Sequence, residues 1–322
     1  MKFFIFLATF LIVFFLYLHI VFHLKKSSDL EVYDIEQPSK TKLEEICDLR
    51  QPVTFKFNNQ RLLESCSLLN ISDNYSAFDI NIRNVNDEIE DKKDLYVPLV
   101  LKEAIILFNN DDEKRYISMN NTDFLEETAL IKSYKYNDEF LRPPMTSKCS
   151  YDLLSGTVNN TTPLMYNLDY RNYYLVTHGD VSIKLIPPSS TRYMYPVSDY
   201  LNFEFRSPID PWNIQEKYKP DFDKIKTLDI RLKQGDIIHI PAYWWYSIKY
   251  NSLSSICTFK YRTYMNTIAI SPYIIIHLLQ KTNVKRDAVK TKTDVIINSS
   301  NDVKRENINQ DSETLNVTPN GK

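Results

Sequence analysis

Glycine is scarce in this chain. Gly156, Gly179, Gly235 and Gly321 are the four glycines among 322 residues, and no two of them lie close together. Loops that cradle phosphate groups need closely spaced glycines, because the backbone itself must approach the ligand. The sequence therefore excludes nucleotide-binding folds that depend on GxGxxG or Walker loops.

The chain also lacks a charge excess and any close pair of cysteines. It carries 39 basic and 41 acidic residues, a formal net charge of −2, so we expect no nucleic-acid partner. Cys47, Cys66, Cys149 and Cys257 show no CxxC spacing, which argues against a zinc or dithiol redox motif. They could form two disulfides in an oxidising compartment, or serve as small core residues in a reducing one.

Formal charges are absent from residues 3–22, which lie between Lys2 and the pair Lys25 and Lys26. A helix of this length spans about 30 Å, the thickness of a bilayer's hydrocarbon core. A cleaved signal peptide is the competing interpretation, but the apolar run exceeds the usual h-region and no small-residue cleavage site follows it. We therefore expect residues 1–23 to be a transmembrane anchor that contacts the membrane through residues 3–22.

The orientation of this anchor depends on weak signals. The positive charges on its two sides are nearly balanced, so the positive-inside rule gives little preference. Triplets of the N-x-S/T type would be glycosylation acceptors in a lumenal chain, although a chain rich in Asn also forms them by chance. We expect the domain after the anchor to be lumenal or extracellular, with possible glycosylation at Asn70, Asn74, Asn120, Asn159, Asn160, Asn298 and Asn316.

The rest of the chain divides by composition. Residues 24–46 are polar and predict a linker, 47–281 predict one compact domain, and 282–322 lack aromatic residues and predict a disordered tail. Short runs rich in β-branched and aromatic residues predict strands at 78–83, 172–176, 181–186, 229–232, 237–240 and 255–261. Apolar spacing and capping residues predict helices at 97–108, 121–133 and 273–280. The domain is thus expected to be mainly β with flanking helices, a sandwich or barrel of the jelly-roll type.

Two stretches carry a more specific signal, NYYLVTHGDVSIKLIPP at 172–188 and GDIIHIPAYWWYSI at 235–248. They resemble the cupin-like, JmjC-related domain of the Fe(II)/2-oxoglutarate hydroxylases, in which HxDxxxN precedes a turn glycine and a Pro-Pro pair, and GDxxxIPxxWWH follows. The resemblance implies a double-stranded β-helix, and Gly179 is expected to form a hairpin turn. The matching positions are Asn172, Gly179, Pro187, Pro188, Gly235, Asp236, Ile240, Pro241, Trp244 and Trp245.

The positions that hold iron in this family carry other residues here. Counted back from Asn172, the HxD positions hold Tyr166 and Leu168. Counted from 162–164, a TPL triplet that resembles the start of the family's TPLHxD, they hold Met165 and Asn167. Neither alignment supplies a histidine, and thioether or aliphatic side chains are poor ligands for Fe(II).

Two further positions point the same way. The family's distal histidine corresponds to Tyr246, and a lysine that pairs with 2-oxoglutarate corresponds to Val181. Valine leaves a dicarboxylate without a counter-charge. The resemblance therefore implies a domain that has kept the barrel and lost its iron and 2-oxoglutarate ligands, so that no cofactor is expected.

Other arrangements stay open in the sequence. His178, Asp180 and His239 could form a relocated metal site, although His178 and Asp180 fit a solvent-exposed turn better. Asp169 could be a surviving carboxylate if one residue is inserted locally. The aromatic run 243–246 could stack on a sugar or peptide, but such runs more often pack a core.

Two functions follow. The first is a membrane-anchored, glycosylated, non-catalytic module that binds an unknown protein or glycan ligand or serves a structural role. The alternative is an Fe(II)/2-oxoglutarate-dependent hydroxylase of proteins or glycans with a non-standard metal site, which would need both cofactors.

Overall fold

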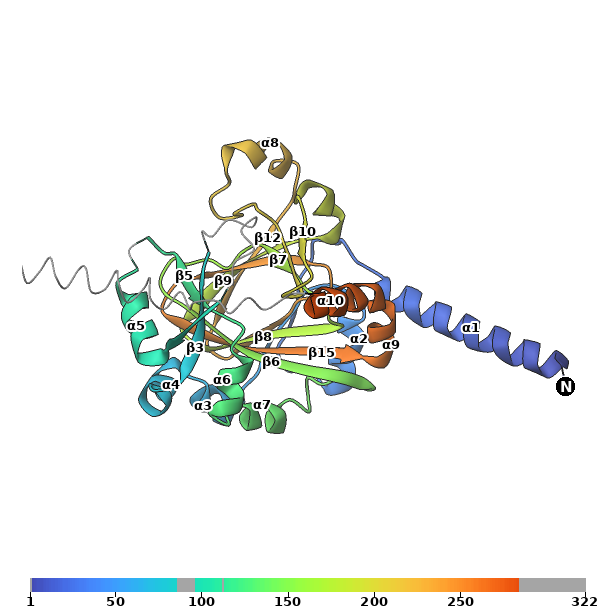
Figure 1. The fold of residues 1–322 in the computed structure, drawn as a ribbon, viewed down its shortest axis with the longest axis horizontal. Coiled ribbons are helices and arrows are strands. Elements are labelled where there is room, and N and C mark those ends of the chain that lie inside the picture. The colour runs from blue at the N-terminus through green and yellow to red at the C-terminus, as the bar shows by residue number, and fades with distance from the viewer. Residues whose placement is uncertain (1, 86–95, 112, 284–322) are drawn as a thin grey trace, which may run out of the picture. The chain divides into compact units, whose positions relative to one another are not determined.

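The computed structural model describes residues 2–85, 96–111 and 113–283. Its domain is built on two sheets (Figure 1). The first has nine strands in the order β1-β2-β13-β8-β15-β6-β5-β3-β4. Their bounds are β1 Tyr33–Ile35, β2 Val53–Lys56, β13 Asp236–His239, β8 Arg171–His178, β15 Ser254–Thr263, β6 Thr146–Gly156, β5 Tyr116–Ser118, β3 Asp79–Asn84 and β4 Val97–Val100.

The second sheet has six strands in the order β10-β11-β7-β14-β9-β12. Successive strands alternate between the sheets: β8 is followed by β9, β12 by β13 and β14 by β15. This alternation is typical of a double-stranded β-helix, and the predicted fold class is confirmed. The bounds are β10 Val197–Asp199, β11 Glu204–Arg206, β7 Met165–Tyr166, β14 Trp245–Tyr250, β9 Asp180–Ile186 and β12 Leu228–Lys233.

Glycine occurs at two of the turns at which the chain passes from one sheet to the other. Gly179 (φ +77°) lies between β8 and β9, and Gly235 (φ +86°) lies between β12 and β13. The hairpin predicted at Gly179 is wrong, because β9 pairs with β12 and β14 while β8 pairs with β13 and β15. The turn instead passes the chain from one sheet to the other, and a left-handed backbone suits glycine there.

Helices cover the outer face of the first sheet. Buried side chains of α2 to α7 form one apolar cluster with the outward-facing residues of β6, β8 and β15, such as Tyr151, Tyr173 and Phe259. A second cluster fills the space between the sheets. The helices are α1 Lys2–Leu24, α2 Lys40–Cys47, α3 Gln60–Ser65, α4 Leu68–Tyr75, α5 Leu101–Asn109, α6 Thr122–Glu127, α7 Ile131–Asn137, α8 Lys219–Phe222, α9 Tyr264–Ala269 and α10 Ser271–Asn283, with 3₁₀ helices at Pro188–Tyr193 and Glu216–Tyr218.

Two predicted helices differ from the structure. Residues 97–100 form strand β4 at the edge of the first sheet, and the helix begins at Leu101. Pro98 explains the difference, because proline disfavours helix at the residue before it and is tolerated in an edge strand. The helix predicted at 121–133 is divided into α6 and α7, and between them Ala129 takes a positive φ of 59°.

The predicted linker is partly folded. Within residues 24–46, β1 pairs in parallel with β2, and α2 begins at Lys40 with Ser39 as its N-cap. Leu43 of α2 is buried in the helix-covered cluster. The polar residues of α2 form the exposed side of an amphipathic helix that packs on the domain, so this part of the segment is not a free linker. Of the predicted tail, residues 284–322 lie outside the described part of the chain.

The four cysteines are free thiols in the structure, so the two disulfides that an oxidising compartment would allow are not formed there. Cys47, Cys66 and Cys257 are buried in the helix-covered cluster, and Cys149 is half-buried beside it. Burial raises the pKa of the Cys47 thiol, which keeps it protonated and unreactive. The structure therefore shows them as small core residues.

Helix α1 has almost all of its side chains exposed, and His23 near its end is buried. Among the described residues it is the helix that is long and apolar enough to cross a membrane.

Candidate functional site

The structure distinguishes between the two alignments of the HxD positions. Met165 in β7 lies opposite both Tyr246 in β14 and Arg206 in β11, so these three side chains share one face of the second sheet. That face points into the cluster between the sheets, where Met165 and Tyr246 are buried. Tyr166 points the other way, and its ring lies 5.1 Å from Phe205 and 4.7 Å from Trp245. Tyr166 and Tyr246 therefore do not face each other.

Asn167 joins two tyrosines at this place. Its amide Nδ2 donates to the Tyr174 hydroxyl at 2.8 Å and to the Tyr246 hydroxyl at 3.2 Å. The two rings are 5.2 Å apart, and both are buried. Burial, followed by the neighbouring Tyr246, raises the pKa of Tyr174 well above its usual value, so its hydroxyl stays neutral. We call Asn167, Tyr174 and Tyr246 the Tyr–Asn–Tyr cluster.

These residues do not fit an iron site. Fe(II) in such a barrel takes two imidazoles and a carboxylate on one face, whereas this face presents a thioether, an amide and a phenol. Leu168, the other candidate position, is buried in an apolar cluster with Phe205 and Tyr243. Val181 is fully buried between the sheets. Among the described residues, no group of three His, Cys, Asp or Glu side chains is placed to hold a metal ion.

The relocated site is not assembled either. His239 pairs with Tyr173, which lies five positions before His178 in β8, or about 17 Å along the strand. His239 is fully buried on the helix-covered side, 5.1 Å from the Tyr173 ring. Asp180 forms an ion pair with Arg231. The three side chains are therefore separate.

Asp169 does not act as a surviving ligand in this arrangement. Its carboxylate is hydrogen-bonded to the Arg262 guanidinium, and both side chains are largely buried. Asn172, the landmark for the first alignment, donates to the backbone carbonyls of Asp169 at 3.0 Å and Ile240 at 3.2 Å. These contacts explain Asn172 as a residue that holds β8 to the end of β13.

Charged side chains near the cluster were missed by the sequence analysis. Arg83 and Arg206 are almost fully buried, with exposed fractions of 4% and 3%. Arg83 donates to Glu204 at 3.1 Å, Tyr96 donates to the same carboxylate, and Arg206 lies 3.5 Å from it. Alternation in β11 (Glu204–Arg206) would have placed Glu204 and Arg206 on one face, but a strand of three residues gives a weak pattern.

Lys260 adds a third cation on the inward face of β15. It lies two and four residues after Thr258 and Ile256, and Ile256 belongs to the cluster between the sheets. Burial alone would lower the pKa of Lys260, but Tyr246, Asp169, Asp152 and Glu204 outweigh burial and raise it. Lys260 is therefore charged and lies within electrostatic reach of the Tyr–Asn–Tyr cluster.

Comparison with known families agrees with this architecture. A family model described as "Cupin-like domain" matches residues 25–268, well over half of the chain. The chain belongs to the cupin-like domain family. The resemblance inferred from the two sequence stretches is thereby confirmed, and the match begins before residue 47, as the folded segment with β1 and α2 requires.

One curated relative is the human protein named HSPB1-associated protein 1. It is 26% identical over 139 residues, which make up 43% of this chain and 27% of that protein. The chain thus matches little more than a quarter of that relative's length.

The cupin-like domain has a cavity beside its buried arginines. The cavity has a volume of about 720 Å³ and is lined by Arg83 and Arg206, by Thr162 and Leu164 near β7, and by Lys217. Polar and apolar groups are mixed in this lining, which suits a ligand with both kinds of surface.

The aromatic run 243–246 belongs to the core of the cupin-like domain. Trp244 and Trp245 are fully buried, and their indole N–H groups donate to the Arg50 carbonyl at 3.1 Å and to the Thr191 hydroxyl at 3.0 Å. Tyr243 and Tyr246 are also buried. The run is therefore a packing element and not an exposed stacking platform.

The possible glycosylation sites differ in exposure. Asn74, Asn120 and Asn159 are exposed, and Asn70 is half-buried. Asn160 is fully buried, and its amide donates to the Tyr116 carbonyl at 2.6 Å. A glycan on Asn160 is thus incompatible with this fold. Asn298 and Asn316 lie outside the described residues.

Proposed function

We propose that this chain is a membrane-anchored cupin-like module that works without iron and 2-oxoglutarate, as a binding or structural protein. The observation that carries the proposal is the Tyr–Asn–Tyr cluster. At the place where the family holds its metal, the Asn167 amide is hydrogen-bonded to the hydroxyls of Tyr174 and Tyr246.

The cluster supports a non-catalytic role on physical grounds. A half-buried amide and two buried hydroxyls satisfy one another, and separating them would leave polar groups without partners, at about 1 to 3 kcal/mol each. A metal ion at this place would have to break these hydrogen bonds and would gain no imidazole or carboxylate in return.

The anchor and its orientation are part of the proposal. Helix α1 is long and apolar enough to span a bilayer, and we propose that it stays attached as a signal-anchor. Exposed sequons at Asn74, Asn120 and Asn159 support a lumenal or extracellular domain that is glycosylated.

The ligand of such a module would be a protein or glycan. The cavity beside Arg83 and Arg206 gives it a place to bind a polar group. The name of the human relative describes association with another protein, which favours a protein partner for this chain as well.

The test is the metal content and turnover of the full-length protein, purified in detergent and supplied with iron and 2-oxoglutarate. We expect a folded protein that retains no stoichiometric iron and produces no succinate. Bound iron in a one-to-one ratio together with succinate production would refute the proposal and favour the hydroxylase.

A rebuilt site provides the positive control. The triple variant Met165→His, Asn167→Asp, Tyr246→His places two imidazoles and a carboxylate on the inward face, and we expect it to bind Co(II) with a visible absorption band. The matched variant Tyr166→His, Leu168→Asp, Tyr246→His follows the other alignment and should not bind, since Tyr166 points away from Tyr246.

A further inference from the structure

The surface beside the end of α1 is apolar and exposed. Two helices, α9 and α10, follow β15 there, and their large apolar side chains have few neighbours to cover them. Leu278 and Leu279 are 54% and 57% exposed. We define the α9–α10 face by Tyr264, Ile268, Ile275, Ile276, Leu278 and Leu279.

The last turn of α1 is fixed to the domain next to this face. His23 is buried, and its Nε2 lies 3.1 Å from the hydroxyl of Thr263, the N-cap residue of α9. The Arg50 guanidinium donates to the Phe22 carbonyl at 3.4 Å, and its positive charge stabilises the C-terminal end of the helix. The direction of α1 therefore sets how the domain meets a membrane.

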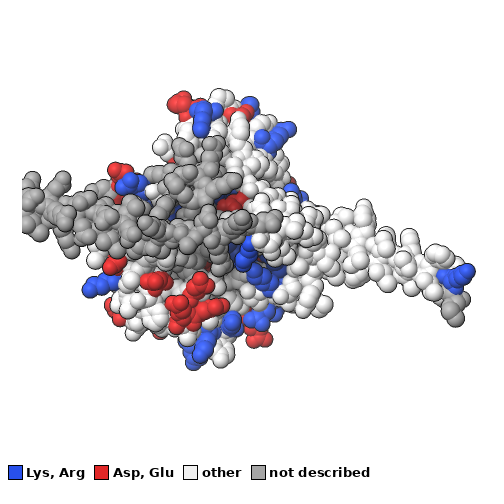
Figure 2. Space-filling view, in the orientation of Figure 1, with Lys and Arg blue, Asp and Glu red and all other residues white. Residues whose placement is uncertain are grey.

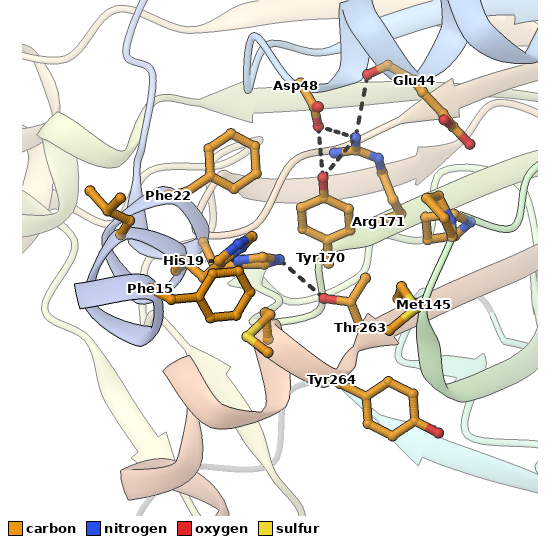
Figure 3. Close-up of a pocket in the computed structure, with 15 residues that line it drawn as sticks. Phe15, His19, Phe22, Glu44, Asp48, Met145, Tyr170, Arg171, Thr263 and Tyr264 are labelled. Atoms are coloured by element: carbon orange, nitrogen blue, oxygen red, sulfur yellow. Dashed lines mark hydrogen bonds and ion pairs between the residues drawn. The ribbon is translucent and has the colours of Figure 1, made fainter. Parts of the chain in front are cut away.

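A cavity of about 640 Å³ lies between α1 and α9. Phe15, Leu18 and Phe22 line it from α1, and Tyr264 and Met265 line it from α9 (Figure 3). The helix rises about 12 Å between Phe15 and His23. If α1 spans a bilayer, Phe15 lies at the depth of the acyl chains, and the α9 side chains that line the same cavity lie beside the membrane boundary.

Basic residues surround this surface. Lys25 and Lys26 are exposed directly after α1, and Lys281 is exposed near the end of α10. The pKa of Lys148 is lowered by burial and by the nearby positive charges of Arg262 and Lys281, which shows that these cations are close together. In Figure 2 the surface next to the exposed helix is largely uncharged, with a group of Lys and Arg beside it.

We propose that the α9–α10 face docks on the lipid bilayer, with its apolar side chains inserted at the boundary between headgroups and acyl chains. The proposal rests on the membrane anchor proposed above. Two observations make the bilayer the partner of this face. The face adjoins the helix that would enter the bilayer, and the lysines at its rim match anionic headgroups.

The experiment measures lipid contact along the full-length protein in vesicles of phosphatidylcholine and phosphatidylserine. Single cysteines at Leu279, Phe10 and Val158 are introduced in a Cys149→Ser background and labelled with an environment-sensitive fluorophore. Nitroxide-labelled lipids then quench those labels that contact acyl chains. Val158 is the matched control, an exposed apolar residue near the opposite end of β6 and β15.

We expect the Leu279→Cys label to lose most of its fluorescence, as the Phe10→Cys label does, while the Val158→Cys label keeps its signal. Quenching at position 10 without quenching at 279 would overturn the docking and leave the anchor intact; a second copy of the chain covering the face would give this result. Absence of quenching at position 10 would instead refute the anchor itself.

Discussion

At the scale of single residues, the interior of the barrel holds a network of hydrogen-bonded polar groups and a partly buried cation. Asn167 satisfies the hydroxyls of two tyrosines, and Lys260 is held charged by the acidic groups and Tyr246 near it. Buried polar networks of this kind make a core specific, because removing one member leaves the others unpaired. The side chains that we propose to exclude a metal would therefore also help to define the fold.

His239 gives a residue-scale prediction about pH. Burial, followed by the charges of Arg171 and Arg50, lowers its pKa well below 6.5, so the folded protein keeps the ring neutral. The unfolded chain takes up a proton below about pH 6.5, so the free energy of unfolding falls as the pH falls, by up to about 1.4 kcal/mol per unit. Denaturant unfolding between pH 7 and 5 should show this slope, and His239→Phe should flatten it.

His239 and the acidic groups affect the free energy of unfolding in different pH ranges. The pKa of Asp48 is lowered below 3.8 despite its partial burial, through the charge and hydrogen bond of Arg171, and its contribution is lost only at more acidic pH. If wild type and His239→Phe lose stability with the same slope between pH 7 and 5, another group is responsible.

The candidate site was predictable in part. The sequence identified the region around 165–168 and Tyr246, but the spacing to Asn172 left two alignments. The pair Tyr166 and Leu168 points away from Tyr246. Strand pairing resolves this, since Met165 lies opposite Tyr246. Spacing along a chain cannot show which face of a short strand points inward when its neighbours are unknown.

At the scale of elements, the crossings between the sheets are the places where backbone conformation matters most. Gly179 lies so close to the turn before β15 that an added Cβ would be 2.3 Å from the Ser254 hydroxyl. Gly235 has the same left-handed backbone but open space, with Asn58 Oδ1 at 3.8 Å.

These two glycines allow a paired prediction. Gly235→Ala should lower the free energy of unfolding by about 1 to 2 kcal/mol, the cost of a left-handed alanine. Gly179→Ala adds a steric clash and should cost about 1 to 3 kcal/mol more. Equilibrium urea unfolding of the two variants would measure the difference. Equal losses would show that Ser254 moves aside at little cost.

Strands were predicted better than their surroundings. The runs at 172–176, 181–186 and 255–261 lie within β8, β9 and β15, because β-branched and aromatic side chains fit pleated, buried surfaces. Strand β6, with its Cys, Ser and Lys residues, gave no such signal, although it makes the longest pairing with β15. Its strand conformation comes from its neighbours in the sheet, which local propensity does not contain.

At the scale of the whole molecule, the proposed anchor α1 would determine which compartment the domain faces, and the exposed sequons allow that orientation to be tested. Asn74 and Asn159 lie on the surface, while the Asn160 amide is committed to the Tyr116 carbonyl inside the fold. A lumenal domain would thus show glycosylation that discriminates between two adjacent asparagines.

We predict this discrimination for the full-length protein made in a cell with a secretory pathway. Endoglycosidase should increase its electrophoretic mobility, and Asn74→Gln, Asn120→Gln or Asn159→Gln should each remove part of that shift, because an exposed asparagine can carry a glycan without disturbing the core. Asn160→Gln should leave the shift unchanged and lower the thermal stability, since the buried amide loses its fit. A protein without any endoglycosidase-sensitive glycan would favour the opposite orientation of α1, with the domain facing the cytosol.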